Sequence, residues 1–254
     1  MIDQLRAEIG RLREAAAPLE PDADQRRAIG GQALEHALAY WDQVETASSN
    51  RPWSEVFSQR LDPEFAEQGR EPAAIFDYVR ACIDAPGFAT TSPRFMAYIP
   101  GGAIPYSALG DLLAATSNKY SGFASASPGA VRIENACVAW LGSVIGYPQD
   151  AGGTLTSGGS IANLTGVVAA REGRDPDGGG AVYVTRFAHY CIDKAFHIAG
   201  RGRSPKRIID TDDQYRMSAE APEQALEEDR RNGIRPWMGV ASAGTVDTGA
   251  LAPR

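Results

Sequence analysis

TSGGSIANLTG, residues Thr156–Gly166, joins a short apolar run to a helix-like segment and places two glycines between serines at the junction. Glycine loses more backbone freedom on folding than any other residue. A glycine pair at such a junction therefore usually marks a backbone conformation, or a close approach, that a side chain would prevent. We interpret the stretch as a strand–turn–helix unit whose turn lies close to a ligand.

The residues around this turn alternate between short apolar runs and helix-like segments. Strands are expected at residues 154–156, 181–185, 207–210 and 238–243, and helices at 161–171, 190–199 and 222–231. This alternation predicts right-handed crossovers and a mainly parallel sheet flanked by helices. The fold class is therefore α/β.

The part of the chain before the turn has a different character. Apolar residues from Ile29 to Val44 recur at helical spacing, and Pro72 suits the first position of another helix. Residues 86–105 are too rich in proline and glycine for a regular element. Two further helices are expected, at 106–119 and after the N-cap pair Ser127-Pro128. We therefore divide the chain into an N-terminal helical segment with a pocket loop, 1–104, and the first part of a large α/β domain, 105–254.

Composition excludes several classes of function. The 254 residues carry a net charge of -7 without a Lys/Arg cluster, which argues against nucleic-acid binding. We find no apolar run near the ~20 residues that span a bilayer, and no secretory h-region at the N-terminus. The three cysteines are too few and scattered for a disulfide framework. We expect a cytoplasmic protein that binds neither nucleic acid nor membrane.

The glycine turn is best suited to a phosphate group. Gly158, Gly159 and Ser160 are expected at the carboxyl end of a strand and the start of a helix, where unpaired N–H groups and the helix dipole favour an anion. The sequence has neither the lysine of a Walker loop nor G-x-G-x-x-G spacing at this point, so a nucleotide is disfavoured.

The sequence fits two other chemistries less well. Ser160, flanked by small residues, fits a loose nucleophile elbow, and PGGA at 100–103 could serve as an oxyanion loop. A serine hydrolase would need a late histidine, but His189 and His197 both precede the last predicted strand. No metal site is predicted, because the chain's three histidines lie far apart or without a carboxylate pair.

Several segments together resemble the group II pyridoxal-phosphate-dependent amino acid decarboxylases, which include the aromatic-L-amino-acid, glutamate and histidine enzymes. The similar segments are PRFMAYIP, SALGDLLAATSNKY, SASPGAVRIENACVAWL, SGGSIANLTGVVAARE, VYVTRFAHYCIDKAFHIAG, IIDTDDQYRM and GVASAGTVDTGA. The resemblance extends from about Pro21 to the end and follows the family's order. It implies a fold-type I large domain, pyridoxal 5'-phosphate as cofactor, and a homodimer.

The resemblance also implies roles for individual residues. Gly158, Gly159 and Ser160 would hold the cofactor phosphate, and His189 would stack on the pyridine ring near the reacting carbon as the catalytic histidine. Ser242 would face the cofactor where many relatives have threonine. The implied substrate-binding residues belong to the pocket loop and are Tyr98, Ile99, Pro100 and Gly101. Ser92 stands where relatives often have histidine.

The implied reaction is decarboxylation of an L-amino acid to the amine and CO2. The segment AYIPGGA of the pocket loop, residues 97–103, holds no charged residue, which favours an aromatic or apolar substrate, because an acidic one would need a buried arginine. Relatives continue beyond this point to an aspartate that pairs with the pyridine nitrogen and to a Schiff-base lysine. Neither Asp247 nor Lys194 matches these positions, so we expect an N-terminal portion that is inactive alone. The alternative is a catalytically dead remnant or partner subunit of the same fold.

Overall fold

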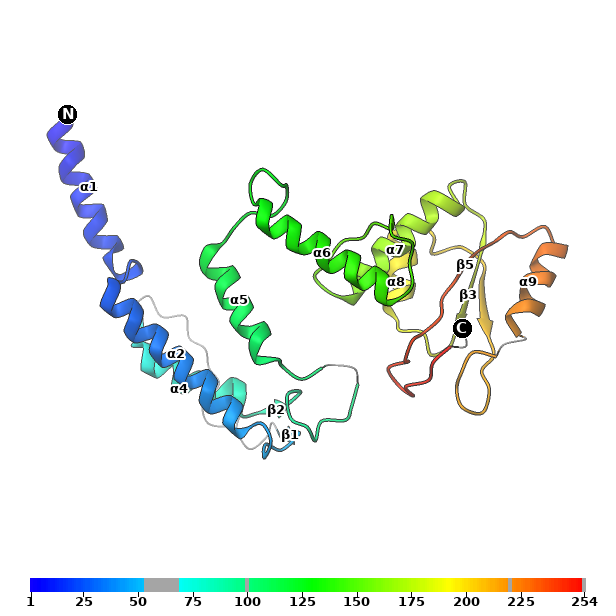
Figure 1. Ribbon diagram of the computed structural model, residues 1–254, viewed down its shortest axis with the longest axis horizontal. Helices are drawn as coiled ribbons and strands as arrows, with labels where there is room; N and C mark the ends of the chain where they lie inside the picture. The colour runs from blue at the N-terminus through cyan, green and yellow to red at the C-terminus, as the bar shows by residue number, and fades with distance from the viewer. Residues whose placement is uncertain (53–68, 99–100, 219–220, 253–254) are drawn as a thin grey trace. The chain divides into compact units, whose positions relative to one another are not determined.

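A computed structural model describes residues 1–52, 69–98, 101–218 and 221–252. The chain forms two compact units, Met1–Leu109 and Gly110–Arg254, and each is described by itself. Figure 1 shows the elements of both. The expected substrate-loop residues Ile99 and Pro100 lie outside the described residues.

The first unit is mainly helical, as the apolar spacing predicted. Its elements are α1 (Ile2–Ala16), a 3-10 turn (Ala17–Leu19), α2 (Ala23–Gln43), β1 (Asn50–Arg51), α4 (Pro72–Val79), a π-helical turn (Arg80–Asp84) and β2 (Gly87–Phe88). Asp22 and Gln25 form a capping box that starts α2. The short antiparallel pair of β1 with β2 was not predicted, because two-residue strands carry no periodicity.

Polar contacts within this unit fasten α2 and the residues after it to the loop that precedes Tyr98. His36 Nε2 lies 2.7 Å from Asp84 Oδ2, and Tyr40 Oη lies 2.8 Å from Thr91 Oγ1. Ser92 is buried and donates to the carbonyl of Ala47 at 3.0 Å. A serine at position 92 therefore has a structural role as an anchor for this loop.

The second unit contains a three-stranded parallel sheet in the order β4-β3-β5. Its strands are β3 (Ala181–Thr185), β4 (Lys206–Ile209) and β5 (Pro236–Gly239). All five residues of β3 are buried, because helices cover both faces of this central strand. The parallel α/β architecture is confirmed, and three of the four expected strands form.

The expected strand at residues 154–156 is wrong. These residues form no strand pairing, and Leu155 is 54% exposed. The backbone N–H of Leu155 contacts only a side chain, Glu134, at 3.4 Å. A strand exists only where a neighbouring strand accepts its hydrogen bonds, and none of the described strands lies alongside.

Helices form layers on the two faces of the sheet. The helices after the first unit are α5 (Pro105–Ser117), which begins within it, α6 (Pro128–Val144), α7 (Gly159–Arg174), α8 (Cys191–Ile198) and α9 (Ala221–Arg231). Side chains of α7 and α8 pack on Val182 and Val184 of β3, whereas α9 packs on Ala181 and Tyr183 of its other face. Successive side chains of β3 lie on opposite faces of the sheet, so this one strand contributes to the hydrophobic cores on both faces.

The helix expected after Ser127-Pro128 forms as α6, but no residue of that helix is buried. Ile133, Trp140 and Val144 are more than 60% exposed. Ser127 occupies the N-cap position, as predicted, without making a side-chain capping bond. Helical periodicity identified the element correctly without showing what covers its apolar face.

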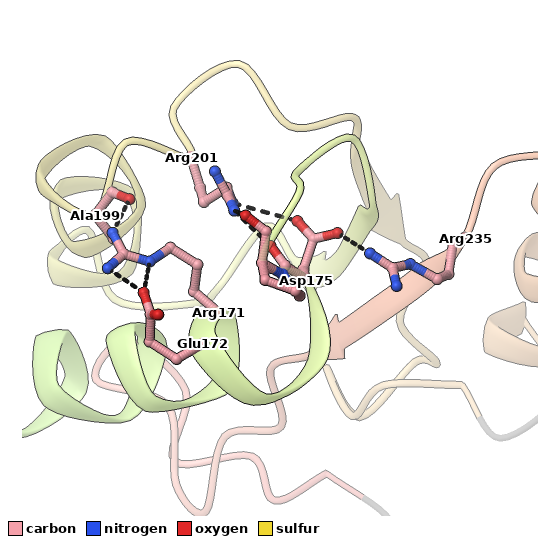
Figure 2. Close-up of polar contacts among 7 residues, drawn as sticks. Arg171, Glu172, Asp175, Ala199, Arg201 and Arg235 are labelled. Atoms are coloured by element: carbon pink, nitrogen blue, oxygen red, sulfur yellow. Dashed lines mark hydrogen bonds and ion pairs between the residues drawn. The ribbon is translucent and has the colours of Figure 1, made fainter.

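Two buried aspartates fasten the ends of these elements. Asp175, which follows α7 and is 0% exposed, lies between Arg201 and Arg235, as Figure 2 shows. Asp175 Oδ2 and Arg201 Nε are 3.2 Å apart without hydrogen-bond alignment, so this contact is an ion pair. Arg201 also donates to the carbonyl of Asp175. Together these contacts join the end of α7, the residues after α8 and the start of β5.

The second aspartate, Asp229, fastens α9 to the sheet. It is 1% exposed, accepts a 2.6 Å hydrogen bond from the Tyr183 hydroxyl, and is paired with Arg207 at 2.5 Å. Arg207 above all holds the pKa of Asp229 below its usual value, against the opposing effect of burial, and Tyr183 lowers it further. Burial, helped by Asp229, raises the pKa of Tyr183.

Candidate functional site

The turn at the start of α7 has a backbone that glycine alone adopts readily. Gly158 is the N-cap residue, with φ +151° and ψ 171°, and its carbonyl accepts the N–H groups of Ile161 and Ala162 at 3.1 and 3.0 Å. A residue with a Cβ avoids this region of backbone conformation. Thr156 Oγ1 donates to the same carbonyl at 3.1 Å and braces the turn from outside the helix. The close backbone geometry expected from the glycine pair is therefore present.

The space in front of this turn suits a phosphate group. A Cβ built on Gly158 or Gly159 would meet no heavy atom within 4 Å. The first N–H groups of a helix have no intrahelical acceptor and carry the positive end of its dipole, and the first turn of α7 contains no acidic residue. Ser160 is exposed beside them and offers a hydroxyl donor. The residues present therefore fit the phosphate of pyridoxal phosphate.

His189 lies in the connection from β3 to α8 and is exposed. Its Nδ1 accepts the backbone N–H of Cys191 at 3.2 Å, so the neutral imidazole carries its proton at Nε2. Its ring lies against that of Tyr190, with 4.2 Å between the centroids and 37° between the planes. A backbone contact and a tilted neighbouring ring thus orient the imidazole and leave an Nε2–H donor.

One amide side chain, which sequence reasoning missed, connects the glycine turn with the region of His189. Asn163 Nδ2 donates to the carbonyl of Gly159 at 2.8 Å and reaches Cys191 Sγ at 3.5 Å. Cys191 is buried in the core between α7 and α8 and is the residue whose N–H meets His189. The structure therefore brings the glycine turn and the histidine together. The only sequence signal for this was the spacing of four between Gly159 and Asn163, which places both on one helix face.

The other predicted residues are less closely connected. Ser242 follows β5, and the carboxyl ends of the parallel strands β3 and β5 meet at one edge of the sheet, so Ser242 and His189 lie at that edge. Ser242 makes a backbone contact with Ala252. Tyr98, with φ +61°, and Gly101 belong to the first unit.

Other chemistries receive no support from the described residues. Across the described ranges, Ser160 Oγ has no hydrogen bond to a histidine, as a hydrolase nucleophile would. The same residues hold no cluster of three His, Cys, Asp or Glu side chains suited to a metal ion. None of the helices in this part of the chain is long and apolar enough to span a membrane.

These features define a class: an α/β protein with a parallel sheet, a glycine turn at a helix start, and an oriented imidazole in the connection that follows the central strand. Comparison with known proteins identifies the family. Residues 55–252 match the model of the pyridoxal-dependent decarboxylase conserved domain. The chain belongs to this family, whose cofactor is pyridoxal 5'-phosphate.

Individual relatives agree with this assignment. The chain is 28% identical to the aromatic-L-amino-acid decarboxylase of Bacillus atrophaeus over 92% of its own length and 49% of that protein. It is 30% identical to a tyrosine decarboxylase of Oryza sativa subsp. japonica, covering 91% of this chain and 47% of the relative. The fold matches the crystal structure of Catharanthus roseus tryptophan decarboxylase with a TM-score of 0.79, at 22% identity and over 92% of this chain and 53% of that one. The chain therefore has part of the fold-type I domain and spans about half the length of the curated relatives it matches.

Proposed function

We propose that the protein represented by this chain decarboxylates an aromatic or apolar L-amino acid to the amine and CO2, with residues 158–160 holding the phosphate of pyridoxal phosphate. The observation that carries the proposal is the link from the glycine turn to His189, which unites a phosphate cradle with an oriented imidazole. When bound, pyridoxal phosphate supplies the electron sink for the pair that departing CO2 leaves behind.

The chain's own residues bind and orient in this proposal. The N–H groups of Gly159 and Ser160 and the Ser160 hydroxyl bind the phosphate, and Gly158 keeps the backbone open to it. His189 presents an imidazole face to the cofactor ring and holds a proton at Nε2, within the connection that leaves β3. Ser242 contributes a hydroxyl from the end of β5.

The substrate preference rests on the loop before residue 99. Phe88 lies 5.7 Å from Phe95 and 6.3 Å from Tyr98 between ring centroids, which makes an aromatic cluster. The nearby cation, Arg94, donates its guanidinium to the carbonyl of Thr46 at 2.9 Å. An acidic side chain would need a cation to offset its burial, and this loop offers aromatic surface instead. We propose that Tyr98, Ile99, Pro100 and Gly101 contact the substrate.

The substrate proposal is tested by turnover. The longest protein that the gene encodes should release CO2 faster from tyrosine or tryptophan than from glutamate at equal concentrations. A preference for glutamate would contradict the assignment of the loop. The homodimer implied by the resemblance and the cytoplasmic location expected from the composition are proposals of the same rank, checked by light scattering and by fractionation.

Binding at the glycine turn is tested in residues 1–254 with Ser160→Ala. Loss of one hydroxyl donor to a charged phosphate should weaken pyridoxal phosphate binding by about 1.5–3 kcal/mol, because the backbone donors remain. Ser143→Ala is the matched control, since Ser143 donates only to Trp140 within α6. Equal affinity for both variants would argue against the site.

The alternatives make different predictions for the same chain. If Ser160 were a hydrolase nucleophile, a fluorophosphonate would label it, and pyridoxal phosphate would not protect it. If the protein were a catalytically dead remnant or partner subunit, the longest gene product would bind the cofactor normally and release no CO2 from any amino acid.

A further inference from the structure

We infer that Asn163 is a positioning residue that couples the phosphate turn to His189, and this inference rests on the proposed function of the turn. Asn163 lies one helical turn after Gly159, so its side chain returns to the carbonyl of that residue at 2.8 Å. The same amide nitrogen reaches the sulfur of Cys191, the first residue of α8, at 3.5 Å. One side chain therefore contacts the starts of both helices.

The second half of the link runs through Cys191. Its thiol is buried among Val167, Ile192 and Ala195, which fixes the residue in the core. Its backbone N–H donates to Nδ1 of His189 at 3.2 Å. A displacement of the first turn of α7 therefore reaches the imidazole through two side chains and one backbone group.

The contacts of this link use one polar group of each residue and leave another facing the proposed cofactor. Gly159 uses its carbonyl toward Asn163, which points its N–H group the other way, toward the proposed phosphate. Cys191 uses its N–H toward His189 Nδ1, which leaves Nε2–H as the free donor of the ring. Asn163 thus supports both polar groups that would face the cofactor, while touching neither phosphate nor ring itself.

A helix-local role is the competing explanation, and the same helix supplies its control. Thr165 Oγ1 also donates to the carbonyl four residues earlier, that of Ile161, at 2.9 Å. Its hydroxyl makes no hydrogen bond to α8 in the described part of the chain. Asn163→Ala removes a back-bond together with the contact to α8, whereas Thr165→Ala removes a back-bond alone.

The experiment compares four forms of residues 1–254: unchanged, Asn163→Ala, Thr165→Ala and Ser160→Ala. The chain has three histidines, so the Cε1–H resonance of His189 is assigned by its loss in His189→Gln. In the cofactor-free protein, Asn163→Ala should shift this resonance and Thr165→Ala should leave it in place. On titration with pyridoxal phosphate, Asn163→Ala should weaken binding about 2- to 10-fold, the scale of one neutral hydrogen bond.

Partial rescue gives a second readout of the link. Cys191→Ser keeps an acceptor for Asn163, so its His189 resonance should stay closer to that of the unchanged chain than the resonance of Cys191→Ala. Identical His189 resonances in Asn163→Ala and Thr165→Ala would overturn the inference. Failure of the unchanged chain to bind pyridoxal phosphate would instead overturn the proposed function, and the cofactor-free comparison would still decide the role of Asn163.

Discussion

At the scale of single residues, the glycine turn shows how backbone conformation dictates residue type. Gly158 has φ +151°, whereas Gly166 lies in the interior of α7 without a positive φ. Neither would bring a Cβ within 4 Å of another atom. Both positions therefore have room for a Cβ atom, and they differ only in backbone conformation.

This difference predicts opposite effects of the same substitution. Gly158→Ala should lower the free energy of unfolding by roughly 1–3 kcal/mol, because alanine is strained at that conformation. Gly166→Ala should raise it by about 0.5–1 kcal/mol, because alanine restricts the unfolded chain and suits a helix. Urea unfolding of the two variants measures both values. A neutral Gly158→Ala would show that the turn relaxes easily.

At the scale of elements, buried ion pairs decide how α9 and the end of α7 are held. Asp229 on α9 meets Tyr183 of β3 and Arg207 of β4, so one carboxylate joins a helix to two neighbouring strands. Asp175 joins three segments through two arginines. Each aspartate is surrounded by protein, so removing a partner leaves a desolvated charge.

Arg207→Ala should therefore destabilise the fold at pH 7 by about 1–3 kcal/mol, the scale of leaving a carboxylate without its charged partner, since the Arg207 side chain is itself 37% exposed to water. Asp229 has its pKa lowered by Arg207, so the pair stabilises the fold above the carboxyl's unfolded pKa, about 3.9, and this stability disappears as pH falls through the lower folded pKa. The difference in the free energy of unfolding between Arg207→Ala and the unchanged chain should accordingly become smaller below about pH 4.

Urea unfolding midpoints of both proteins at pH 7 and pH 3 measure this difference in the free energy of unfolding. Arg80→Ala serves as the control, because its pair with Asp77 is exposed on both sides and should contribute little at either pH. A gap that stays constant with pH would mean that Arg207 stabilises the fold by packing rather than by its charge.

At the scale of the whole molecule, the chain holds three lysines, and none of them contacts the glycine turn in the part of the chain that the structure describes. Lys206 Nζ is paired with Asp193 at 2.9 Å. Lys194 Nζ lies 4.5 Å from the centre of the Tyr190 ring, and Lys119 is exposed. Residues 1–254 therefore offer hydrogen bonds and an imidazole to the cofactor. Their described lysine ammonium groups make other contacts or none with the glycine turn.

We expect residues 1–254 to bind pyridoxal phosphate weakly and without a covalent bond, and to release no amine from an amino acid. After incubation with the cofactor, borohydride reduction and dialysis, mass spectrometry should find no stoichiometric adduct. A stoichiometric adduct that Lys194→Arg abolishes would show that this chain uses its own lysine, and amine formation would contradict the prediction directly.

The sequence by itself determined the parallel α/β class, the glycine turn and the position of His189, because these depend on local periodicity and on a backbone that only glycine tolerates. It also identified the family, since several motifs occur in order along most of the chain. It could not show that residues 154–156 remain unpaired, because pairing depends on a neighbouring strand and not on the residues themselves.

Only the tertiary structure decided which side chains connect distant segments. Asn163 and Cys191 are 28 residues apart in the sequence and meet because α7 packs on α8. Asp175 and Asp229 likewise form ion pairs with arginines of other segments. Asparagine, cysteine and aspartate are common polar or small residues with no periodic signal of their own. Their partners are chosen by packing in three dimensions, which a linear pattern does not encode.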